Sequence, residues 1–203
     1  MNLIERQSYL KLDALKELGN ISSAHAITGL SELMKKRIDV SITNVDIIPL
    51  KIINTLFNGP ESMVSVVYLE GYNENFKGKM FLILSYPEAD KMVSMVSNRR
   101  PEDVDPDEYN LSVLKEVGNI MCGCYLNTMS VFLGNKIMYS VPNVSKDMLG
   151  AVMDSILADL SIESDYAIVV ETAFNFREDQ VNGFLFFIPD TDSLEKLFEV
   201  IGV

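Results

Sequence analysis

Two short stretches of the chain each place a glutamate and an asparagine three residues apart. Glu17 and Asn20 form the first pair, and Glu116 and Asn119 form the second. Successive residues of an α-helix are rotated by 100°, so each pair falls within an arc of about 60° on one side of a helix. A carboxylate attracts a cation, and an amide can hold a water molecule through its donor and acceptor groups. The two pairs are therefore candidate binding or catalytic sites.

A further polar residue stands four positions before each glutamate, on the same side of the helix: Asp13 in the first stretch and Ser112 in the second. The opposite side of each helix is apolar, which predicts that it packs on a core while the polar side faces solvent. The apolar positions are Leu15, Leu18, Ala26 and Leu33 in the first stretch, and Leu114, Val117, Met121, Tyr125 and Phe132 in the second.

A glycine directly precedes each asparagine, at Gly19 and Gly118. Glycine inside a helix costs about 1 kcal/mol relative to alanine, so helix stability does not explain its presence. One interpretation is that the missing side chain lets another backbone approach, so that the polar side inserts into a pocket of another protein. The other is that the glycines allow tight packing within the chain, while the glutamates belong to an ordinary solvated face.

The two stretches belong to an internal repeat. Residues 12–45 and 111–144 are identical at 12 of 34 aligned positions. A fainter similarity continues downstream, where 78–83 resembles 183–188. We therefore predict one domain over 1–203, built from a first repeat (1–98), a polar linker (99–105) and a second repeat (106–203).

The patterning of each repeat predicts a long helix, three strands and a closing helix. We expect helices over 3–36, 87–97, 147–160 and 190–201, a helix beginning at Pro106 behind the capping residue Asp105, and strands over 38–45, 64–69, 79–84, 136–141, 167–172 and 183–188. Ser85 and Glu88 are spaced as a capping box for the helix that follows them. The fold class is α/β (α+β): a single compact domain with pseudo-two-fold symmetry, a continuous sheet and two long helices that carry the motifs.

The composition excludes several other classes of protein. The net charge of −12 argues against partners with anionic surfaces, both nucleic acid and membrane. One histidine and two cysteines are too few for a typical structural zinc site, so we expect no metal site, and a metal-dependent hydrolase is disfavoured. No apolar run is long enough to cross a bilayer, and the first residues lack a signal-peptide pattern. We expect a monomeric cytoplasmic protein.

With these motifs, the sequence resembles the CheC/CheX/FliY family of chemotaxis phosphatases, and most closely its CheC-type members. The family signature is Asp or Ser, three residues, Glu, two residues, Asn, twenty-two residues and Pro. The second repeat matches it completely and ends on Pro142, whereas the first has Thr43 at the position of the proline. The resemblance covers essentially the whole chain, including the duplication.

The resemblance implies a phosphatase that acts on the aspartyl-phosphate of a CheY-type response regulator. Asn20 and Asn119 would orient the attacking water, while Glu17 and Glu116 would pair with a lysine of the regulator. Asp13, Ser112 and Pro142 would support the motif. The chain would need no cofactor of its own, because Mg²⁺ would be bound by the regulator.

The resemblance also implies a second partner, the receptor deamidase CheD. The amphipathic helix expected over 147–160 has no counterpart of equal length in the first repeat, which makes Asp147, Gly150 and Asp154 the candidate contacts. An alternative function follows: a non-catalytic adaptor that binds CheD and the phosphorylated regulator. The plainer interpretation of this helix is that it covers the sheet.

Overall fold

The computed structural model describes residues 3–74, 76–97, 105–158 and 166–201. Its elements follow one another in this order: α1 (Leu3–Met34), β1 (Asp39–Pro49), the 3₁₀ helix η1 (Leu50–Leu56), β2 (Met63–Asn73), β3 (Phe76–Ser85), α2 (Tyr86–Val96), α3 (Pro106–Phe132), β4 (Met138–Tyr139), β5 (Asn143–Met148), α4 (Leu149–Ala158), β6 (Tyr166–Phe176), β7 (Asp179–Pro189) and α5 (Thr191–Ile201).

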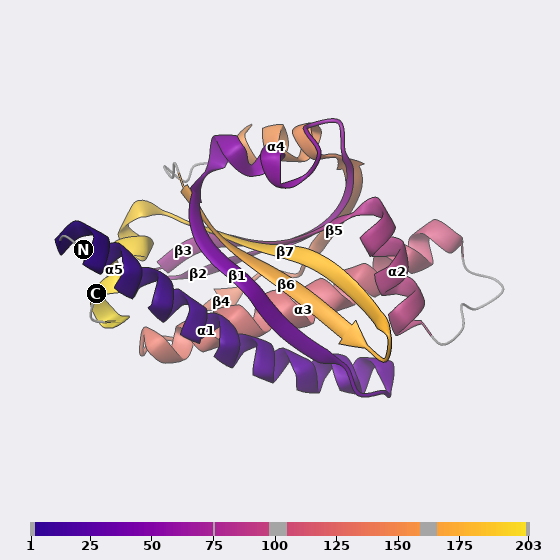
Figure 1. Cartoon of the computed structure of the whole chain (residues 1–203), viewed down its shortest axis with the longest axis horizontal. Coiled ribbons are helices and arrows are strands. Elements are labelled where there is room, and N and C mark those ends of the chain that lie inside the picture. Colours follow the sequence, from indigo (N-terminus) through magenta and orange to yellow (C-terminus); the bar gives the residue numbers. More distant parts are fainter. Residues whose placement is uncertain (1–2, 75, 98–104, 159–165, 202–203) are drawn as a thin grey trace.

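The described strands form one antiparallel sheet (Figure 1). Its order is β1-β6-β7-β3-β2-β4, and β5 also pairs with β2. The two repeats contribute equivalent strands: β1 corresponds to β4–β5, β2 to β6, and β3 to β7. When each strand is replaced by its equivalent, the same order is read from the opposite edge of the sheet. This is the arrangement expected of a pseudo-two-fold axis between β3 and β7, and the predicted fold class is confirmed.

The strand register corrects one detail of the repeat. Strands β2 and β6 have equal lengths and start at Met63 and Tyr166, which are 103 positions apart. The same separation relates Leu82 to Leu185, and these two residues are paired at the centre of the sheet. The sequence comparison of 78–83 with 183–188 is therefore shifted by two residues. Such a shift keeps every side chain on the same face, so the apolar pattern cannot reveal it.

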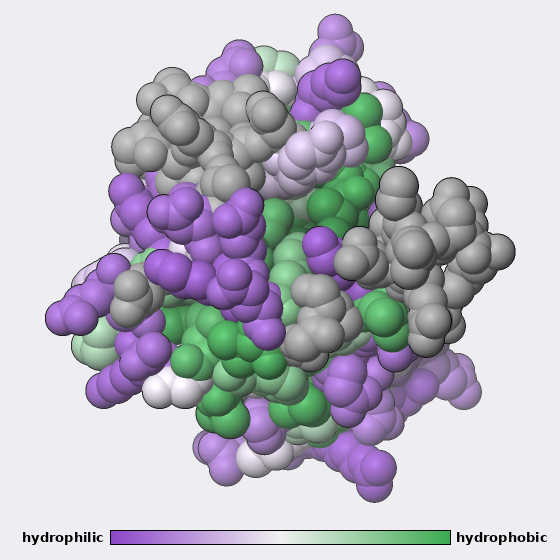
Figure 2. All heavy atoms as spheres, turned by 90° about the vertical axis from the view of Figure 1, so that its left-hand side faces the viewer, coloured by the Kyte–Doolittle hydropathy of each residue, from purple (hydrophilic) through white to green (hydrophobic). Residues whose placement is uncertain are grey.

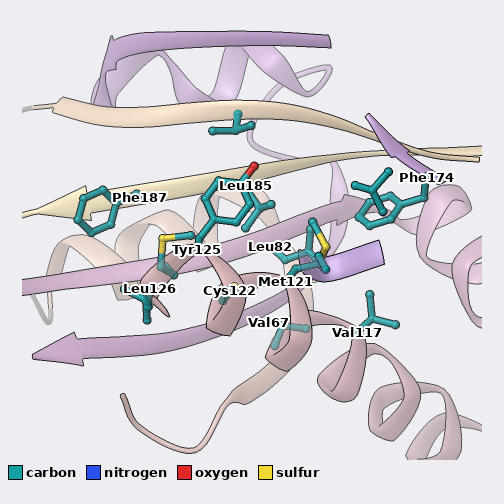
Figure 3. Packing of buried hydrophobic residues seen from close by; sticks show 14 of the residues in the cluster. Val67, Leu82, Val117, Met121, Cys122, Tyr125, Leu126, Phe174, Leu185 and Phe187 are labelled. Carbon is teal, nitrogen blue, oxygen red and sulfur yellow. The ribbon is translucent and has the colours of Figure 1, made fainter. Parts of the chain in front are cut away.

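The sheet has a hydrophobic core on each face. Helices α1 and α3, joined by α2 and α5, cover one face, and Leu82 points into that core (Figure 3). Helix α4 and η1 cover the other face (Figure 1), where Phe81 and Ile83 belong to the second core. Seen from the end that carries the N-terminus, hydrophobic residues gather in a central band with hydrophilic residues around it (Figure 2). No described helix is both long enough and apolar enough to span a membrane.

Helices α1 and α3 lie side by side and run in opposite directions (Figure 1). Gly29 of α1 faces Ile120 of α3, and further back along α1 the hydroxyl of Ser23 lies 3.5 Å from that of Tyr125. The apolar positions predicted for both helices are buried or half-buried against the sheet. Their inward sides are thus fixed by packing, which holds the opposite, polar sides in place.

Several element boundaries differ from the sequence prediction. The expected strand over 136–141 shortens to two residues, and the chain then pairs again as β5. The helix expected over 147–160 begins only at Leu149, because Asp147 and Met148 continue the ladder with β2. The last two residues of that helix and nearly all of the linker 99–105 lie outside the described residues.

The two predicted helix caps behave differently. The Asp105 carboxylate accepts hydrogen bonds from the backbone N–H groups of Asp107 and Glu108, at 2.9 and 3.2 Å, which confirms it as the cap of α3. The prediction of a capping box for α2 is wrong, because the Ser85 side chain makes no capping hydrogen bond. Glu88 instead accepts from the backbone N–H of Asn182 at 2.8 Å and ties α2 to β7.

Candidate functional site

The structure places the two Glu–Asn pairs on the outward sides of α1 and α3. Glu17, Asn20 and Glu116 are exposed, and Asn119 is half-buried. The preceding polar residues of the pattern, Asp13 and Ser112, are exposed as well. Each helix is therefore amphipathic in the predicted sense, with the motif directed away from the sheet.

The functional groups of the two pairs are not used by the rest of the fold. Within the described part of the chain, the side chains of Glu17, Asn20, Glu116 and Asn119 make no hydrogen bond or ion pair. The Ser112 hydroxyl, in contrast, is already hydrogen-bonded within α3, since it donates to the carbonyl of Tyr109 at 2.7 Å. The carboxylates and amides of both pairs are thus available to a partner.

The two glycines of the motifs face the sheet. A Cβ atom on Gly118 would lie 2.5 Å from the Cβ of Val67 in β2, and one on Gly19 would lie 2.5 Å from the Cδ1 of Ile42 in β1. Both glycines are buried. The interpretation that they admit another protein's backbone is therefore wrong. They bring each helix close to a strand within the chain, which sets the height of the motif above the sheet.

The position of Pro142 in the signature marks a break in an edge strand. Ser140, Val141 and Pro142 separate β4 from β5, and β5 begins directly afterwards at Asn143. In the first repeat the ladder of β1 with β6 shifts register between Ile42 and Asn44, which leaves Thr43 as the extra residue of a β-bulge. The Thr43 hydroxyl donates to the carbonyl of Glu171 at 3.2 Å. Both repeats thus interrupt the edge strand at the same place, by different means.

One residue beside the second motif was missed by the sequence analysis. The hydroxyl of Tyr139 in β4 lies 3.3 Å from the place that a Cβ on Gly123 would occupy. Gly123 stands four residues after Asn119 and so lies on the same side of α3. The available signal was Gly123, the second glycine of α3, which permits a close approach just as Gly118 does.

The candidate partner contacts near α4 do not form one exposed helical face. Asp147 belongs to β5 and borders a cavity of about 350 Å³ between this strand and α4. Gly150 is half-buried, and its N–H donates to the carbonyl of Pro60 at 2.8 Å. Asp154 is exposed on α4. Two of the three residues therefore offer a side chain to a partner, from different elements.

No described part of the chain gathers three or more metal-ligating side chains. Cys122 is buried, and burial raises the pKa of its thiol. Burial also raises the pKa of the Cys124 thiol and of the Tyr125 phenol. All three groups stay protonated near neutral pH, which suits a role in the core rather than in chemistry.

Comparisons with known proteins agree with these features. The sequence model of the CheC-like family matches residues 10–41 and 110–145, the two stretches that contain the motifs. The chain is 30% identical over 197 residues to the CheY-P phosphatase CheC of Bacillus subtilis (strain 168), covering 95% of this chain and 94% of the relative. It is also 30% identical over 143 residues to the flagellar motor switch phosphatase FliY of the same organism, covering 70% of this chain but only 37% of that relative.

Solved structures share the fold. The structure of FliY from Thermotoga maritima superimposes with a TM-score of 0.71 at 22% identity, covering 99% of this chain and 98% of that one. The chemotaxis protein CheX from Vibrio vulnificus gives a TM-score of 0.54 at 12% identity, covering 86% and 99%. At these identities the likeness concerns the fold alone.

Proposed function

The chain belongs to the CheC-like family, and from this premise we propose that it removes the phosphoryl group from the aspartyl-phosphate of a CheY-type response regulator. The observation that carries the proposal is the pair of exposed Glu–Asn sites whose side chains have no partner within the described chain. A fold that keeps these groups free on two packed helices leaves them for another molecule. The related phosphatase from Bacillus subtilis, similar over nearly its whole length, points to the same reaction.

In the proposed reaction each asparagine orients a water molecule. The amide of Asn20 or Asn119 accepts a hydrogen bond from the water and directs its oxygen at the phosphorus of the regulator. The new P–O bond forms as the bond between phosphorus and the aspartate oxygen breaks, and the products are inorganic phosphate and a free aspartate. Phosphoryl transfer depends mainly on positioning and electrostatics, and a hundredfold acceleration requires about 2.7 kcal/mol.

Each glutamate has a separate role, which is to fix the regulator on the helix. The carboxylate of Glu17 or Glu116 pairs with a lysine in the regulator's active site, one turn of helix away from the asparagine. The fold supports such positioning because Gly19 and Gly118, next to the asparagines, are packed against the sheet. The chain provides no nucleophile, and the Mg²⁺ ion of the reaction belongs to the regulator.

A second candidate is an adaptor that binds CheD and the phosphorylated regulator with little turnover. Its support is the exposure of Asp147 and Asp154 around α4, an element that differs from its shorter counterpart η1. Under either proposal the protein acts as a monomer in the cytoplasm.

Loss of phosphate from a phosphorylated CheY-type regulator distinguishes the two candidates. A phosphatase shortens the lifetime of the phosphorylated form at substoichiometric protein concentration. An adaptor binds the phosphorylated regulator but leaves its lifetime unchanged. Measuring binding and phosphate release on the same samples therefore supports one candidate and contradicts the other.

A further inference from the structure

The two motifs have different neighbours at the edges of the sheet. Beside the second motif, the ring of Tyr139 lies against Gly123, one helical turn beyond Asn119. Tyr139 is 37% exposed. It lies in β4, the edge strand that pairs with β2 at Gly71 and Tyr72.

Apolar side chains continue from Tyr139 along this edge. Val141 is 73% exposed at the break before Pro142. Tyr72 and Met138 are also about half exposed, but they pair with each other and alternate with Gly71 and Tyr139, so they lie on the opposite face of the sheet. We call Tyr139 and Val141 the β4-edge patch. Exposed large apolar side chains beside a functional motif are typical of a protein-binding surface.

Among the described residues, the first motif has no exposed apolar side chain at the equivalent positions. The counterpart of Tyr139 in the repeat is Val40, which is 7% exposed, and the counterpart of Val141 is Ile42, which is half-buried against Gly19. Here β1 pairs with β6 from Asp39 to Pro49, interrupted by the bulge at Thr43. At the equivalent positions, the second motif therefore has exposed apolar side chains and the first has buried or half-buried ones.

We propose that the β4-edge patch is a docking surface for the response regulator and serves the second motif alone. The proposal rests on the function proposed above and is argued from continuity, since Tyr139 contacts the same side of α3 that presents Glu116 and Asn119. A regulator seated on the second motif covers the patch and buries its apolar area. One seated on the first motif finds the equivalent side chains, Val40 and Ile42, already packed within the chain.

The test introduces Val141→Asp into two half-site backgrounds. Asn20→Ala leaves the second motif intact, and Asn119→Ala leaves the first. In the Asn20→Ala background, Val141→Asp raises KM for the phosphorylated regulator about tenfold and changes kcat by less than about twofold, as expected for a lost docking contact. In the Asn119→Ala background it changes neither constant. Val131→Asp is the matched control, because Val131 on α3 is 80% exposed and lies outside the patch.

A binding measurement separates the failure of this proposal from that of the proposed function. The probe is a CheY-type regulator activated with beryllofluoride, titrated against the chain carrying Glu17→Lys, in which charge reversal blocks the first motif. Weaker binding on adding Val141→Asp, with none on adding Val131→Asp, supports the patch even if wild type shows no phosphatase activity. Unchanged binding, an equal effect in both half-site backgrounds, or no binding by the wild-type chain overturns it.

Discussion

Gly118 lies so close to Val67 that the helix and the strand have no room for another carbon between them. A Cβ on Gly118 would come within 2.5 Å of both Cβ and Cγ1 of Val67, which are fixed to the strand backbone. The equivalent contact of Gly19 involves only Cδ1 of Ile42, the end of a flexible side chain. The two motifs are thus held above the sheet by contacts of unequal rigidity.

This difference predicts unequal effects of the same substitution. Gly118→Ala overpacks the interface and lowers the free energy of unfolding by about 1–3 kcal/mol. Gly19→Ala changes it by less than about 1 kcal/mol, because Ile42 can rotate away and alanine favours the helix. Urea denaturation of both variants measures the two values. Equal destabilisation would show that the two contacts are equally rigid.

The cap of α3 gives a second prediction. Asp105→Ala removes two hydrogen bonds to the first turn of α3 and lowers the free energy of unfolding by about 1 kcal/mol. Ser85→Ala at the start of α2 has little effect, because the Ser85 side chain makes no capping bond. Thermal denaturation compares the two variants. A larger loss for Ser85→Ala would contradict the assignment of the caps.

The stability of the fold is expected to fall in alkaline solution. Burial raises the pKa of Tyr125 and of Cys122 above the values that these groups have in the unfolded chain. Above about pH 9 the unfolded chain therefore releases protons that the folded chain retains, and the free energy of unfolding decreases as the pH rises. Urea midpoints at pH 8 and pH 10.5 test this, with Cys122→Ala and Tyr125→Phe expected to reduce the difference. A midpoint that does not change between these pH values would contradict it.

Each glutamate is expected to act through its charge. Glu116→Gln in the Asn20→Ala background keeps the size of the side chain but removes its attraction for a lysine, so KM for the phosphorylated regulator rises and its dependence on salt weakens. Initial rates at low and high ionic strength measure both effects. Glu108→Gln, also exposed on α3 but outside the motif, is the control with the same change of charge. A loss of kcat without a change in KM would mean that Glu116 acts on the reaction and not on docking.

The sequence predicted the parts of the fold that depend on periodic patterns. The two long helices, their apolar sides and the exposure of Glu17 and Glu116 follow from helical spacing, and the duplicated sheet follows from the repeat. The pairing register of β3 with β7 could not be predicted, because a shift of two residues leaves both faces apolar. The role of the glycines was equally hidden, since whether Gly118 faces a partner or Val67 depends on packing between segments far apart in the sequence.

The edge of the sheet was also beyond sequence analysis. Apolar and β-branched residues over 136–141 favour a strand, but only a few of them can pair, because the neighbouring strand β2 is shared with β5. The proline of the signature was visible at Pro142, whereas the bulge at Thr43 has the same place in the fold without a sequence signal.

The most direct test of the proposed phosphatase function is the rate of phosphate release from a phosphorylated CheY-type regulator in the presence of four forms of the chain. These are wild type, Asn20→Ala, Asn119→Ala and the double variant. We predict that wild type accelerates release, that each single variant retains part of the acceleration, and that the regulator loses phosphate at its own rate in the presence of the folded double variant. A folded double variant that still accelerates release as wild type does would contradict the assignment of the two asparagines.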